Sequence, residues 1–168
     1  MTSSEVLIDA FGRVQEEVHA VVTGLTQEQL GARLDNHANS IGWLIWHLTR
    51  VQDDHLAAVA GTEQVWIAQG WADRFELPFD PGAIGYGQSS DDVAALGTVP
   101  GSALIEYYDA VHAQTVDYVS GITDADLPRV VDAWWDPPVT LGVRIVSVLA
   151  DDLQHVGQAA FIRGIVTR

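Results

Sequence analysis

Apolar side chains recur at helical spacing in four long stretches of the chain. The stretches cover residues 4–22, 39–61, 101–120 and 140–163. Gly24 follows the first stretch as a typical C-terminal stop, while Asn39 or Ser40 and Thr140 are good N-caps for the second and fourth. Each stretch therefore predicts an amphipathic helix that buries one face.

The region between the second and third helices, residues 62–99, has no sustained period and is rich in aromatic residues, proline and glycine. A connection this long in a small domain is usually functional or crosses between helices. The sequence of residues 24–30 resembles that of residues 121–127. This short internal similarity divides the chain into two helix–turn–helix halves. The pattern predicts one domain over 1–168, an all-α antiparallel four-helix bundle with a long crossover between helices 2 and 3.

Composition narrows the class of protein and its partners. At 168 residues, with 48% hydrophobic and 18% charged residues, the chain is long and apolar enough to fold as a globular domain. It has no cysteine, which excludes disulfides, thiolate metal sites and a cysteine nucleophile. A net charge of -15 would repel nucleic-acid phosphates and anionic membrane surfaces, so neither is an expected partner.

Targeting signals are not indicated by the sequence. The residues 1–5 lack the positive charge and apolar run that open a signal peptide, and no apolar stretch has the length needed to span a bilayer. We therefore expect a cytoplasmic protein that does not enter the membrane. All eight basic residues are arginine, a bias that is typical of a GC-rich genome.

The fourth predicted helix carries two polar residues that suggest a metal site. Asp151 and His155 are four residues apart, so they project from one face, and that face adjoins the apolar stripe of the helix. An ionised aspartate turned toward a bundle core costs several kcal/mol unless something compensates its charge. A divalent cation would do so, and imidazole with carboxylate suits Zn²⁺, Ni²⁺, Fe²⁺ or Mn²⁺.

His47, in the apolar centre of the second helix, is the third candidate ligand. A lone histidine there would more often be a core residue, but bundle cores commonly build metal sites from side chains on facing helices. Asp152 is an alternative carboxylate because it lies three residues before His155, although the spacing of four favours Asp151. A hydrogen bond between Asp151 and His155 without a metal is the remaining alternative.

Two signatures carry a resemblance to a known family. Trp46-His47-Leu48-Thr49-Arg50 is followed by two acids at 53–54, and Asp-x-x-x-His-x-Gly-Gln occupies 151–158. The chain resembles the DinB-like superfamily over most of its length. That superfamily includes metal-dependent hydrolases, mycothiol- and bacillithiol-dependent S-transferases, and maleylpyruvate isomerase relatives.

The resemblance implies an up-down-down-up four-helix bundle with three ligands, commonly histidines, around a divalent metal. Here these positions are His47, Asp151 and His155, with an acid where many members have histidine. The implied function is metal-dependent transfer of a low-molecular-weight thiol, with mycothiol favoured by the composition, to an electrophilic small molecule. A binding module without turnover and a metal-dependent hydrolase are the alternatives. Because related bundles often pair, a homodimer is also expected.

Other residues are weaker candidates. His55 lies about two turns after His47, where it would reach the mouth of a pocket, and Trp134 and Trp135 lie in a loop that could line a substrate cleft. Arg50 and Arg144 are candidates to contact polar groups of the substrate, although Arg50 could instead pair with the acids 53–54 on its own helix.

Overall fold

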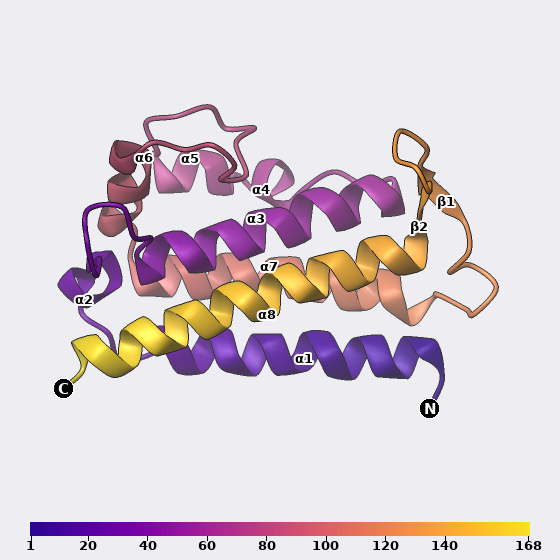
Figure 1. Cartoon of the computed structure of the whole chain (residues 1–168), viewed down its shortest axis with the longest axis horizontal. Coiled ribbons are helices and arrows are strands. Elements are labelled where there is room, and N and C mark those ends of the chain that lie inside the picture. The colour runs from indigo at the N-terminus through magenta and orange to yellow at the C-terminus, as the bar shows by residue number, and fades with distance from the viewer.

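The computed structural model describes all residues, 1–168, and is mostly helical, as predicted (Figure 1). The four long helices are α1 (Ser3–Val22), α3 (Ile41–Ala60), α7 (Gly101–Ser120) and α8 (Leu141–Val166). The shorter elements are α2 (Gln27–Gly31), α4 (Val65–Ala68), α5 (Trp71–Phe75), α6 (Ser90–Ala95), the 3₁₀ helix η1 (Leu96–Thr98), and the strands β1 (Val130–Asp132) and β2 (Val139–Thr140).

The two helices that carry the candidate ligands begin at side-chain caps. Ser40 Oγ accepts a hydrogen bond from the amide of Trp43 at the start of α3, and Thr140 Oγ1 accepts one from Val143 at the start of α8. Each cap satisfies an amide that has no partner within its helix. At its other end, α3 stops at Gly61, whose positive φ of 71° suits glycine.

The long helices pack side by side, α3 against α7 and α8, and α1 against α7 and α8. Figure 1 shows α1 and α8 running in one direction and α3 and α7 in the other. The α3–α8 pair is therefore antiparallel, whereas α3 and α7 are parallel, because the crossover 62–99 returns the chain to the end where α3 began. No helix of the structure is long and apolar enough to cross a bilayer.

A buried ion pair ties the crossover to α3. The two carboxylate oxygens of Asp53 accept hydrogen bonds from the amides of Val65 and Trp66, which open α4, and from the hydroxyl of Tyr107. Arg50, also fully buried, lies 3.6 Å from this carboxylate. Arg50 is therefore part of the support of the crossover, and the suggestion that it contacts a substrate is not supported.

The hairpin of β1 and β2 is an element that the sequence did not indicate. It pairs Val130 with Thr140 and Asp132 with Val139 in an antiparallel ladder. Figure 1 shows it at the end of the molecule where α3 ends and α8 begins. Strands of three and two residues are too short for alternation to be visible in the sequence.

Candidate metal centre

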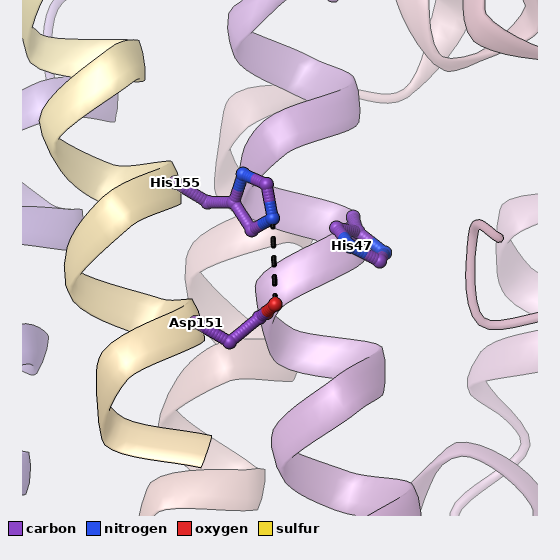
Figure 2. A group of neighbouring side chains, drawn as sticks. All are labelled: His47, Asp151 and His155. Atoms are coloured by element: carbon purple, nitrogen blue, oxygen red, sulfur yellow. Dashed lines mark ion pairs between the residues drawn. The ribbon is translucent and has the colours of Figure 1, made fainter. Parts of the chain in front are cut away.

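The three predicted ligands meet between α3 and α8. Figure 2 shows Asp151 and His155 extending from α8 toward α3, which carries His47. One potential ligand atom from each residue lies within 4.8 Å of the other two. These are the three residues predicted from the sequence, and the antiparallel contact of α3 with α8 brings them together.

His47 is almost fully buried, and its ring is fixed by a hydrogen bond and by ring packing. Its Nδ1 hydrogen-bonds the carbonyl oxygen of Ile84, and its ring stacks on Trp43 with the centroids 4.6 Å apart. A ring nitrogen that faces a carbonyl must be the protonated one, so the free lone pair of the neutral ring is on Nε2. Burial lowers the pKa of His47, which favours the neutral form that binds metals.

Gly85 allows the crossover to approach His47 this closely. Its φ of 110° lies in a region that other residues rarely adopt, and an added Cβ would stand 2.3 Å from His47 Nδ1. The next residue, Tyr86, places its ring edge-on to His47 at 5.4 Å between centroids. The crossover thus forms one wall of the site, which gives the segment 62–99 a definite role.

His155, like His47, has its Nδ1 next to an oxygen acceptor. Its Nδ1 lies 3.1 Å from the side-chain oxygen of Gln158, and its Nε2 lies 3.5 Å from Asp151 Oδ1. A hydrogen bond to Asp151 raises the pKa of His155, and the bond to Gln158 acts in the same direction. Because Gln158 Oε1 accepts the Nδ1 proton, Nε2 of the neutral ring is free to bind a metal.

The two adjacent acids of α8 face different surroundings. Asp151 belongs to the cluster, and its Oδ2 is buried without a hydrogen-bond partner. Asp152 is fully buried on another face of the helix and is not part of the cluster. Burial raises the pKa of Asp152 far above its usual value, so it is expected to be neutral. The geometry therefore favours Asp151 over Asp152 as the carboxylate ligand.

The donor set fits a divalent cation. Two imidazoles are anchored through Nδ1 by an oxygen acceptor, which is the usual second-shell arrangement of metal-bound histidine. The carboxylate supplies a negative charge and has a buried oxygen without another partner. Three protein ligands would leave coordination positions for an exogenous group, as in catalytic sites.

The comparisons with known proteins agree with the helical fold. The family model for mycothiol S-transferase matches residues 6–168, nearly the whole chain. The chain belongs to the mycothiol S-transferase family. It is a DinB-like family, so the resemblance seen in the sequence is confirmed.

A solved structure supports the same fold. The crystal structure described as the conserved protein of locus from Enterococcus faecalis superimposes with a TM-score of 0.90 at 26% identity. The match covers 97% of this chain and 96% of that one. No curated protein matches the chain significantly.

Several residues around the site were not found by sequence reasoning. Ile84, Gly85 and Tyr86 contact His47, and Gln88 accepts a 2.6 Å hydrogen bond from the indole of Trp43. The contacted residues, Trp43 and His47, lie about 40 positions earlier in the chain, so no local spacing reveals these contacts. The cluster of glycines at 82–87 was the available signal, because glycine often marks close approach of a backbone.

The weaker candidates lie outside the three-residue cluster. His55 faces Asp54 at 3.3 Å, and Trp134 and Trp135 are 98% and 66% exposed near the hairpin. Arg144 pairs with Asp132 at 3.1 Å.

Proposed function

We propose that this member of the mycothiol S-transferase family is a metal-dependent transferase in which His47, Asp151 and His155 hold one divalent ion. The observation that carries the proposal is the convergence of their ligand atoms within 4.8 Å, with both imidazoles anchored through Nδ1. When bound, such an ion supplies positive charge that lowers the pKa of a coordinated thiol toward neutrality.

The chain's own residues have distinct roles in this proposal. The carbonyl of Ile84 and the amide oxygen of Gln158 fix the tautomers of the two histidines, so that both rings direct Nε2 to the ion. Asp151 offsets part of the charge of the ion. The four long helices, which we interpret as the bundle of the DinB-like fold, hold α3 and α8 at a fixed spacing.

The outer side of the site is partly exposed. The side chains of Asp151 and His155 remain 23% and 19% exposed, whereas His47 is shielded by Trp43 and the crossover. Access from this side allows a thiol to reach the ligand atoms and allows an electrophile to approach it. The substrate pair we propose is mycothiol and an electrophilic small molecule.

The test is the thiol dependence of electrophile consumption. Purified chain loaded with Zn²⁺, Ni²⁺, Fe²⁺ or Mn²⁺ is incubated with a monochlorobimane-type electrophile, with and without mycothiol. We expect conversion that requires both the metal and mycothiol and that is lost in Asp151→Ala. Hydrolysis without thiol would identify a metal-dependent hydrolase, and metal binding without either reaction would identify a binding module.

A further inference from the structure

A cavity lies between the end of α3, the start of α8 and the hairpin, on the side of the molecule that carries the proposed metal centre. It has a volume of about 720 Å³, within the range of small-molecule pockets. Among the residues that line it are His55 of α3, Arg144 of α8, and Arg129, Asp132, Trp134 and Trp135 of the hairpin region. None of these residues has a part in holding the metal.

The cleft and the metal centre share one face of the α3–α8 pair. Arg144 of the cleft is seven residues before Asp151, so it lies two turns along the same side of α8, and His55 of the cleft lies about two turns after His47 on α3. Seven residues correspond to about 10 Å along a helix. Because α3 and α8 are antiparallel, both steps lead toward the same end of the molecule, where Figure 1 shows the hairpin.

Tyr86 lies between the two regions. Its ring packs edge-on against His47, yet the residue is 66% exposed. Asp151 of the metal centre and Arg144 of the cleft are both close enough to act electrostatically on its hydroxyl.

The cleft is polar, and its charged side chains are held in place by partners within the chain. Arg144 faces Asp132 at 3.1 Å, and His55 faces Asp54 at 3.3 Å. The guanidinium of Arg129 donates to the hydroxyl of Tyr118 and the carbonyl of Val59. Guanidinium donors beside a carboxylate acceptor suit a ligand with several hydroxyl groups, because each hydroxyl can both donate and accept a hydrogen bond.

The two tryptophans add a flat apolar surface at the rim. Trp134 is 98% exposed and Trp135 is 66% exposed, although tryptophan is usually largely buried. An indole exposed next to paired polar groups can stack on one face of a ring while its hydroxyls bind the polar groups. A ligand class that matches both features is a polyhydroxylated ring system.

We infer that this cleft binds the glucosamine–inositol part of mycothiol, with its cysteinyl arm extending past Tyr86 to the metal centre. The inference rests on the proposed function, because it takes mycothiol as the thiol. It assigns the thiol to the hairpin side of the site. The electrophile then approaches from elsewhere on the exposed side of Asp151 and His155.

The experiment uses S-methylated mycothiol, which keeps the ring system and cannot bind a metal as a thiolate. Its affinity for the full chain is measured by calorimetry for wild type, Trp134→Ala, Trp135→Ala and the double variant. Phe161→Ala is the matched control because Phe161 is an aromatic residue of α8 with the same 66% exposure as Trp135 and lies outside the cleft.

We expect the double variant to bind S-methylated mycothiol at least tenfold more weakly, with Phe161→Ala unchanged and all variants folded. Equal binding by wild type and the double variant would overturn the inference. So would a double variant with a raised KM for the electrophile and an unchanged KM for mycothiol, because the cleft would then hold the electrophile.

Failure of the proposed function gives a different result. If wild type transfers no thiol but binds S-methylated mycothiol in a tryptophan-dependent way, the cleft assignment stands and the transferase proposal fails. If wild type transfers mycothiol and the tryptophan variants bind the probe normally, only the cleft assignment fails.

Discussion

Two polar clusters on α3, one turn apart, show how differently buried charges can be used. Around Arg50 and Asp53, both carboxylate oxygens accept hydrogen bonds from the chain, and the guanidinium reaches Gln64, Ala83 and the face of Trp66. Around His47, in contrast, Asp151 Oδ2 has no partner, and one ligand atom each of His47, Asp151 and His155 lies within 4.8 Å of the other two. The carboxylate of the first cluster is closed by the protein, with only Arg50 Nη2 left without a partner, whereas the second cluster leaves a carboxylate oxygen open to a ligand.

This contrast predicts opposite consequences for mutation. A closed cluster should contribute to the free energy of unfolding and be insensitive to metal. An open cluster should contribute little to folding without metal, and should control metal affinity. The four predictions below test the contrast in order of decreasing expected effect.

Asp53→Ala should destabilise the chain most. The substitution leaves the fully buried Arg50 without its partner carboxylate and removes the acceptor of the first amides of α4. Losing one partner of a buried pair costs about 3–5 kcal/mol. Urea unfolding would measure the loss, with Asp73→Ala, an exposed acid of α5, as the control. A loss similar to that of the control would show that the cluster is not structural.

Gly85→Ala should weaken metal binding and folding together. The new Cβ would stand 2.3 Å from His47 Nδ1, so either the crossover or the imidazole must move. The positive φ adds backbone strain of about 1–3 kcal/mol. Gly87→Ala is the matched control, because its φ is also positive but a Cβ there meets nothing within 4 Å. We expect calorimetry to show at least a tenfold loss of Zn²⁺ affinity, roughly that of a second-shell change, for Gly85→Ala alone.

Gln158→Ala should affect the metal and leave folding unchanged. Gln158 orients His155 through Nδ1 and is itself exposed, so its loss removes a second-shell partner without opening the core. Such partners are worth about 10–100-fold in metal affinity. Gln154→Ala, on the same helix but bonded to the backbone of Ala150, is the control. Equal affinities for the two variants would contradict the assigned role of Gln158.

The smallest effect is a pH dependence of the metal-free chain. Asp151 raises the pKa of His155, so protonation of His155 stabilises the folded state. This contribution is fully present below the unfolded pKa of about 6.5 and is lost as pH rises through the higher folded pKa. His155→Gln should remove this slope in unfolding experiments between about pH 5 and 9. In the same range, metal binding to wild type should weaken as pH falls, because the metal must displace the proton.

Sequence periodicity was sufficient for the long helices, and it selected three side chains that the structure brings together. The observed bounds of α1, α3, α7 and α8 differ from the predicted ones by at most a few residues, because each helix has a clear apolar stripe and α3 and α8 also have good N-caps. The spacing of four between Asp151 and His155 also placed both on one face. Asp152, one residue away, turned into the core as helical geometry requires.

Sequence reasoning could not find contacts made by the long connections. Ile84, Gly85 and Tyr86 reach His47 only because Arg50 and Asp53 tie the crossover to α3, and this anchoring depends on the tertiary structure. Arg50 was correctly offered as a partner of the nearby acids, but nothing in the sequence distinguished Asp53 from Asp54. The hairpin was missed because its strands are too short to show a period. The predicted homodimer stays a prediction.

The most direct test of the central claim is the metal content of the untagged chain. Elemental analysis would compare wild type with His155→Ala and with His19→Ala, whose histidine pairs with Asp109 away from the cluster. We predict close to one divalent ion per chain in wild type and His19→Ala, and none in His155→Ala. Absence of bound metal from wild type, even after incubation with Zn²⁺ or Ni²⁺, or retention of metal by His155→Ala, would contradict the claim that His47, Asp151 and His155 form a metal centre.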